Sequence, residues 1–157
     1  MPRRSLEPWA GLEPLEDLAG LCEQRLSLFE AFEAAFELGD VVKARELLAI
    51  LDGLRPGQLT PVLAAHRARF GARLAAKQGD TDVATSFSTA ESIFREHGLT
   101  FLMAVTELEH GEWLVAQGRG DEAEQLLAEA RQIFERLEAT PWIERANAVR
   151  PAEAVAS

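Results

Sequence analysis

The chain has 157 residues, 47% of them hydrophobic, and a formal net charge of −10. This length suits one globular domain that buries about two-thirds of its unfolded surface, and the hydrophobic share argues against a disordered chain. The acidic balance would repel a phosphate backbone, so we expect no nucleic-acid partner. A single cysteine, Cys22, excludes an internal disulfide and suits a reducing compartment.

The order of apolar residues excludes a membrane protein at the sequence level. No apolar run approaches the roughly 18 residues that a spanning helix needs. Acidic residues such as Glu7 and Glu13 interrupt the N-terminus, where a signal peptide would have its apolar centre. We therefore expect a cytoplasmic protein. Ala, Leu, Glu and Arg dominate and Tyr is absent, which predicts an all-α fold.

Prolines and glycines at the N-terminus predict an irregular segment over residues 1–13. Residues 14–21 form either a short helix or an extension of the first long one. From there, Gly39-Asp40 and Gly79-Asp80 each pair a residue that can end a helix at positive φ with one that can cap the next.

Further start signals complete the division of the chain. Thr60-Pro61 and Thr140-Pro141 each place a capping hydroxyl before a proline in the first helical turn. Gly98 closes another helical run, and Thr100 can cap the following one. The domain is expected to cover residues 14–149, with a frayed tail at 150–157. The predicted helices are residues 22–38, 41–54, 61–78, 81–97, 101–117, 121–138 and 141–149.

The sequence matches itself when it is shifted by 40 residues. Most matched residues are small or apolar, as expected where stacked helix pairs bury one continuous core, and Gly71 and Gly111 are each expected where two helices cross closely. Three units of this kind would cover about residues 23–139. The matched pairs are Ala64 with Ala104, Gly71 with Gly111, Leu74 with Leu114, Phe87 with Leu127, Ala90 with Ala130, Ile93 with Ile133 and Phe94 with Phe134.

The third unit carries the clearest family resemblance. It has a glycine at position 111 and a leucine three residues later. Gln117-Gly118-Arg119 then forms a turn, Asp121-Glu122-Ala123 opens the next helix, and Leu127 and Ala130 follow. This order resembles the tetratricopeptide (TPR) pattern. The resemblance implies an α-solenoid of about three helix-turn-helix repeats with a C-terminal capping helix. The units depart from the family in length, and His110 and Glu107 stand where it usually has apolar residues.

A narrower likeness involves three segments, which are residues 56–61, 109–114 and 130–142. They resemble the C-terminal TPR-like region of large bacterial regulators that carry a cyclase or LuxR-type DNA-binding domain with an ATPase module. The nucleotide-binding loop and the cyclase carboxylates of those regulators have no counterpart in this sequence, so their chemistry is not transferred.

No catalytic, cofactor or metal motif emerges from the sequence, and we expect no enzyme. Glu107-x-x-His110 has the one-turn spacing of a carboxylate-bridged metal site, but a second copy is missing. We therefore expect His110 to be partly exposed and salt-bridged to a neighbouring glutamate. Cys22 has no evident histidine partner and is interpreted as a packing residue.

TPR geometry suggests a binding surface, because the first helices of successive pairs line a concave groove. Phe29, Phe32 and Phe36 recur at helical spacing, and their simpler interpretation is core packing. In the alternative interpretation the groove is apolar and accepts an amphipathic helix. The residues predicted to bind a partner are Leu28, Phe32, Phe36, Ala68, Ala72, Val105, Leu108 and Glu112.

Two functions follow as expectations. The first is a protein-interaction module that holds a partner helix or a second copy of itself in the groove. The second is a regulatory segment of a larger bacterial signalling protein. An apolar series is expected to cover the first helix pair, in its own chain or in a dimer. It consists of Trp9, Leu12, Leu15, Leu18 and Leu21.

Overall fold

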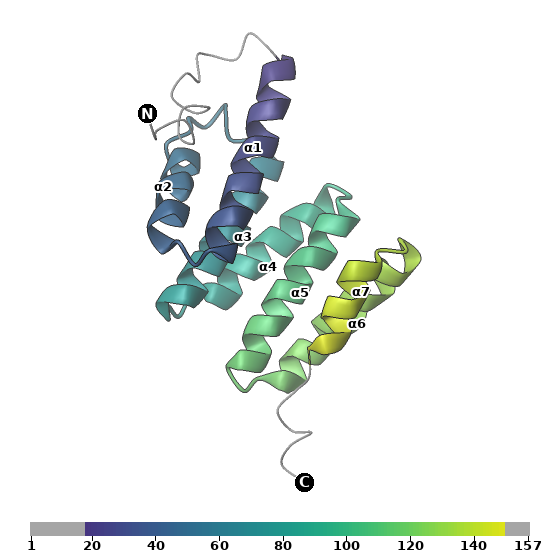
Figure 1. The fold of residues 1–157 in the computed structure, drawn as a ribbon. Coiled ribbons are helices and arrows are strands. Elements are labelled where there is room, and N and C mark those ends of the chain that lie inside the picture. Colours follow the sequence, from purple (N-terminus) through teal and green to yellow (C-terminus); the bar gives the residue numbers. More distant parts are fainter. Residues whose placement is uncertain (1–17, 150–157) are drawn as a thin grey trace. The chain divides into compact units, whose positions relative to one another are not determined.

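The computed structural model describes residues 18–149, and every regular element in that range is a helix (Figure 1). The predicted all-α class is confirmed for this part of the chain. None of the described helices is both long and apolar enough to cross a membrane. The helices are α1 (Leu18–Glu37), α2 (Val41–Asp52), α3 (Pro61–Gln78), α4 (Val83–Glu96), α5 (Thr100–Ala116), α6 (Gly120–Arg136) and α7 (Thr140–Ala148).

Within the predicted domain, the chain falls into two compact units that meet in sequence between Ile50 and Leu51. The first unit contains α1 and most of α2. The second contains the end of α2 and α3 to α7. The expected irregular segment 1–13, the part of the apolar series before Leu18 and the frayed tail 150–157 lie outside the described residues. So do the side chains of Leu18, Leu21 and Cys22.

In the first unit, a tight turn joins α1 to α2. Gly39 has a φ of 68°, a left-handed conformation that glycine adopts without steric cost. The Asp40 carboxylate accepts a hydrogen bond from the Lys43 backbone N–H at 2.9 Å, so it caps α2 as predicted. Gly79 and Gly98, the other predicted helix-ending glycines, have the same left-handed backbone.

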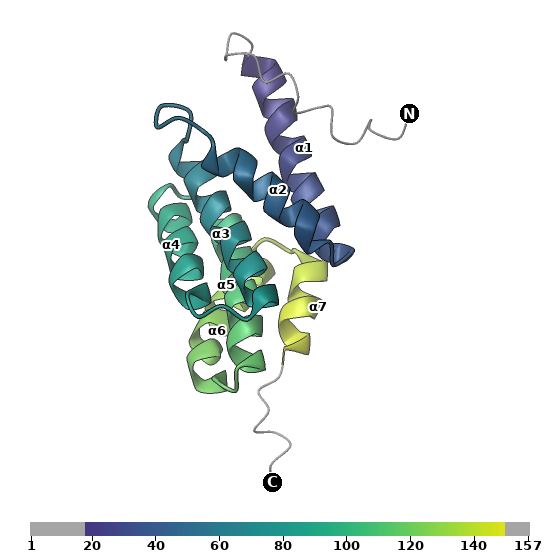
Figure 2. The ribbon, with the colours of Figure 1, turned by 90° about the vertical axis from the view of Figure 1, so that its left-hand side faces the viewer.

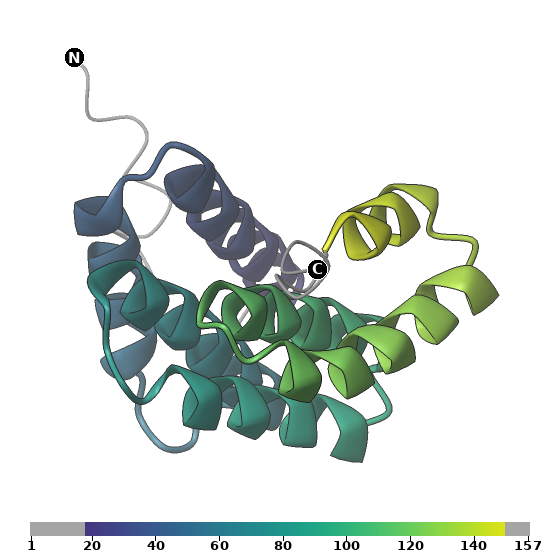
Figure 3. The same cartoon turned by 90° about the horizontal axis from the view of Figure 1, so that it is seen from below.

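In the second unit, each helix from α3 to α7 packs against the next one in sequence (Figures 2 and 3). α3 also contacts α5, so these two alternate helices meet. α7, yellow in Figure 3, packs on α6 at the end of this series. The Trp142 ring stacks on Phe134 with 5.8 Å between centroids, and Ala146 is fully buried. The last helix therefore packs on α6 at the position where a C-terminal capping helix was expected.

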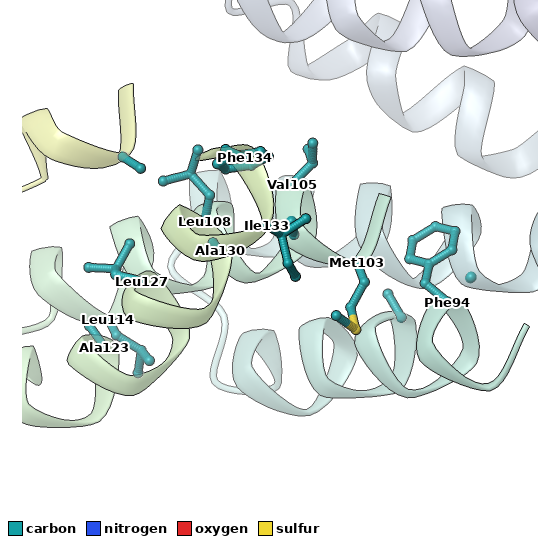
Figure 4. Close-up of a cluster of buried hydrophobic side chains, with 14 residues drawn as sticks. Phe94, Met103, Val105, Leu108, Leu114, Ala123, Leu127, Ala130, Ile133 and Phe134 are labelled. Atoms are coloured by element: carbon teal, nitrogen blue, oxygen red, sulfur yellow. The ribbon is translucent and has the colours of Figure 1, made fainter. Parts of the chain in front are cut away.

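The largest core of the second unit draws its side chains mainly from α4, α5 and α6 (Figure 4). Gly111 lies where α5 crosses α6. A Cβ atom at this position would lie 2.7 Å from Cδ2 and 2.8 Å from Cγ of Leu127. The predicted close crossing at Gly111 is thus confirmed, while Gly71, its match in α3, is half-buried.

Several helix starts differ from the predicted ones. α4 begins at Val83, too late for Asp80 to be its N-cap residue. Thr100 and Thr140 are themselves the first residues of α5 and α7, because the carbonyl of the preceding residue already accepts the first helical hydrogen bond. These three predicted caps are wrong. At Thr60 the prediction is confirmed, since its hydroxyl accepts a hydrogen bond from the Leu63 N–H at 3.3 Å.

Replacing Thr60 with alanine is expected to lower the free energy of unfolding by about 1 kcal/mol, because an N–H at the start of α3 loses its acceptor. Urea denaturation measures this loss. Thr100→Ala is the matched control, since Thr100 is exposed and is not the N-cap residue of α5. Equal losses in the two variants would contradict a capping role for Thr60.

Candidate functional site

The three groove residues predicted in α1 are buried in the structure. Leu28, Phe32 and Phe36 are each at most 7% exposed. The rings of Phe32 and Phe36 stack, with 6.4 Å between their centroids. These observations favour the simpler interpretation, core packing, and they leave little of the three side chains for a partner to contact.

The groove residues predicted in the second unit divide into two groups. Val105 and Leu108 belong to its largest core, and Ala72 packs with the smaller cluster around Phe87. Val105 and Leu108 lie within Met103–Gly111, a stretch of α5 in which every residue is buried, so neither side chain lines an open surface. Val105, Leu108 and Ala72 are thus core residues in this structure. Ala68 and Glu112 are half-buried and remain partly accessible.

A charged cluster lies between α3 and α5, where the sequence predicted an apolar groove. The Arg69 guanidinium donates to both carboxylate oxygens of Glu109, with Nε 3.1 Å from each, and Nη2 also donates to Oε1. Nε of Arg73 lies 3.8 Å from the same carboxylate. Arg69 and Glu109 are both almost completely buried, so their charges are compensated within the protein.

A second ion pair links α5 to α7. Arg145 donates through Nε and Nη2 to the two carboxylate oxygens of Glu112, both at 2.8 Å. The same guanidinium lies 5.4 Å from the centroid of Trp142. Glu112 follows Glu109 by about one helical turn, which puts both carboxylates on one side of α5. Together, the two clusters connect α3, α5 and α7, and we call this side of the second unit the ion-paired face.

A further polar cluster lies where α4, α5 and α6 meet. Glu107 of α5 is completely buried. Arg95 of α4 reaches it from the surface, with Nη2 3.1 Å from Oε1 of Glu107 and 3.1 Å from Oε1 of Glu129 on α6. One guanidinium therefore bridges carboxyl groups from two other helices.

Burial raises the pKa of Glu107 from its ordinary value of 4.5 to about 8. The nearby carboxyl groups of Glu129 and Glu91 contribute to this rise, while the charge of Arg95 opposes it. At neutral pH, Glu107 is therefore mostly protonated and uncharged. The ionised form would place a second negative charge beside Glu129 inside the protein.

His110 is paired with a glutamate, as expected, but it is buried and its partner is not the neighbouring Glu107. Its Nδ1 lies 2.7 Å from Oε1 of Glu91 on α4. The imidazole stacks on Phe87 with 5.2 Å between centroids. The expectation of a partly exposed histidine is wrong because α4 covers this side of α5 and supplies the carboxylate.

The chemistry of these clusters is electrostatic. Each joins side chains from different helices through ion pairs and hydrogen bonds, and such contacts fix the register of the helices. In the part of the chain that the structure describes, no group of three or more His, Cys, Asp or Glu side chains could hold a metal ion.

The sequence analysis did not predict the partner side chains in any of these clusters, although two features of the sequence indicated buried charges. Glu107 and His110 stood at positions where a TPR-like helix usually has apolar residues. Arg69 and Glu109 have opposite charges and are 40 residues apart, which is the length of the repeat.

Comparisons with known proteins add no family assignment. No protein-family model matches the chain, and neither a curated protein nor a solved structure matches it.

Proposed function

We propose that the chain is a non-catalytic protein-interaction module built from TPR-like helix pairs. It binds a helix of a partner protein or of a second copy of itself. The order of packing supports the repeat architecture, because α3 to α7 follow one another and α3 also meets α5. In stacked helix pairs, alternate helices share one extended surface that suits an elongated ligand.

Equivalent burial at positions 40 residues apart also supports repeated pairs. Leu74 and Leu114 are both buried, as are Phe87 and Leu127. The same holds for Ala90 with Ala130, Phe94 with Phe134, and Val83 with Ala123. Four of the seven pairs matched by sequence are therefore buried in both α3–α4 and α5–α6, while Ala64, Gly71 and Ile93 are half-buried where their matches are buried. The shared burial of the four pairs supports a repeat.

The ion-paired face carries the binding proposal. Its ion pairs bring α3, α5 and α7 onto one surface, on which Arg73, Glu112 and Arg145 are partly accessible. A partner helix on this face would meet charged side chains of both signs. The partner is therefore expected to present polar and charged residues of its own, and charge complementarity would set its orientation.

Photo-cross-linking tests this surface. Benzoylphenylalanine at Ala116, an exposed residue one turn beyond Glu112, would report contacts at the ion-paired face without breaking an ion pair. Gln125, exposed on α6, is the control position. We expect a discrete cross-linked product from position 116 in the native host and none from position 125.

Peptide mass spectrometry of the product separates a second copy of this chain from another protein. A helical segment as the cross-linked peptide supports the proposal, whether it comes from this chain or from a partner. Equal, diffuse labelling at both positions, or no product at 116 under saturating illumination, would contradict it.

The second candidate function is the regulatory segment of a bacterial cyclase- or ATPase-type regulator. It is favoured by the likeness in residues 56–61, 109–114 and 130–142. Several of these residues, among them Leu114, Ala130 and Phe134, are buried packing residues, so the likeness supports a common architecture more than a common activity. Co-purification of a cyclase, ATPase or DNA-binding chain would favour this candidate over self-association.

A further inference from the structure

The bridge formed by Arg95, Glu107 and Glu129 contains a feature that ion pairing alone does not explain. Oε2 of Glu107 is buried and has no hydrogen-bond donor among the described groups. Two ionised carboxylates cannot hydrogen-bond to each other, because neither has a donor. A proton on Glu107 would make this carboxyl group a donor, and the carboxylate of Glu129, which Arg95 bridges to Glu107, is a matching acceptor.

We propose that Glu107 and Glu129 share one proton that holds α6 against α4 and α5, and that loss of this proton at mildly alkaline pH loosens α6. This inference is independent of the proposed binding function. It rests on the buried position of Glu107, the two 3.1 Å contacts of Arg95 and the buried oxygen without a donor.

The groups around Glu107 come from each helix that approaches it. α4 supplies Arg95 and Glu91, α6 supplies Glu129, and α5 itself carries His110 one turn later. Glu91 is bound to His110, so it adds negative charge near Glu107 without donating a hydrogen bond to it. α3 also contacts α5, but its arginines described above are directed to Glu109.

The shared proton can exchange with water although Glu107 is buried. The side chain of Glu129 is 42% exposed and that of Arg95 is 57% exposed. A proton released from Glu107 can therefore pass to solvent through Glu129 without unfolding of the core. Two adjacent carboxylates then remain with one guanidinium, and their repulsion acts directly across the contact between α5 and α6.

The sign of the pH effect follows from the direction of the shift. The folded protein holds the Glu107 proton more tightly than the unfolded chain, since the pKa is raised from 4.5 to about 8. The stabilisation is complete below pH 4.5 and is lost as the pH rises to about 8. Within this window, the folded-to-unfolded ratio falls by up to about tenfold per pH unit because of this group.

Glu107→Gln tests the proposal, because the amide keeps a donor for Glu129 and cannot ionise. Urea denaturation from pH 4 to 9.5 should show a stability advantage of the variant that grows between about pH 5 and 8 and is constant outside that range. Glu124→Gln, an exposed change on α6, is the control and should run parallel to the parent. A pH-independent difference between Glu107→Gln and the parent would overturn the proposal.

Hydrogen exchange tests the structural part, after correction for intrinsic base catalysis. Raising the pH from 6 to 9 should increase exchange in α6 (Gly120–Arg136) more than in α3 (Pro61–Gln78), and Glu107→Gln should suppress the increase. An equal increase in both helices, or an unchanged response in the variant, would refute a local loosening of α6.

Discussion

Arg69→Met is expected to lower the free energy of unfolding by about 3 kcal/mol, the largest effect among the substitutions considered. The change removes the guanidinium that donates to both oxygens of Glu109 and leaves that carboxylate buried. Breaking a buried ion pair by removing one partner typically costs about 3–5 kcal/mol. The lower end applies because Arg73 lies 3.8 Å from the same carboxylate. Urea denaturation at neutral pH measures the loss.

Two variants separate this effect from a general loss of charge. Arg67→Met, two residues away, removes an arginine that lies 3.9 Å from Asp52 and is partly exposed, so its effect should stay within about 1 kcal/mol. Adding Glu109→Met to Arg69→Met removes the stranded carboxylate and should recover much of the stability. A double variant less stable than Arg69→Met alone would contradict a buried, mutually compensating pair.

Gly111→Leu is expected to destabilise the protein by roughly 1–3 kcal/mol through overpacking. Already the first added carbon would lie 2.7 Å from Cδ2 of Leu127, and the rest of the side chain has to enter the same α5–α6 crossing. Leucine favours helix over glycine by somewhat less than 1 kcal/mol, which offsets part of the loss. Thermal unfolding followed by circular dichroism measures the net effect.

Gly57→Ala is the control for the glycine substitution. Nothing lies within 4 Å of a Cβ atom at this position, and its backbone is not left-handed. Its stability should therefore change by less than about 0.5 kcal/mol. Unchanged thermal stability of Gly111→Leu would mean that α5 and α6 do not cross closely at this glycine.

The helices were predictable because their signals are local. Gly39 and Thr60 act through the backbone within one turn, and both were assigned correctly. Thr100 and Thr140 failed as caps because each helix begins one residue earlier, and sequence alone rarely fixes an end to that precision. The 40-residue spacing also anticipated a long-range feature, the crossing at Gly111.

The polar interior was not predictable from helical periodicity. Glu107, Glu109 and His110 are stabilised by side chains on other helices. Glu91 lies 19 residues from its partner His110, and Arg69 lies 40 residues from its partner Glu109. Periodicity places charged residues on the surface by default. Only the packing of α5 against α3, α4 and α6 shows that these charges are buried and paired.

The burial of most predicted groove residues was also not predictable from periodicity. A concave apolar surface needs one side of each first helix to remain open. Residues Met103–Gly111 of α5 are buried on every side, so Val105 and Leu108 are core residues. The accessible part of the ion-paired face contains Glu112 and Arg145. Glu112 was among the residues predicted to bind a partner, but a search for apolar residues gave no reason to select Arg145.

The repeat architecture underlies both the proposed fold and the proposed binding surface, and nuclear Overhauser contacts at the two matched glycines test it most directly. The structure puts Gly111 against Leu127. If the two helix pairs are true repeats, the Gly71 α-protons should likewise show contacts to the ring of Phe87, 40 residues before Leu127. Contacts at both glycines would support stacked, equivalent pairs. A Gly111–Leu127 contact without a Gly71–Phe87 contact would contradict the repeat.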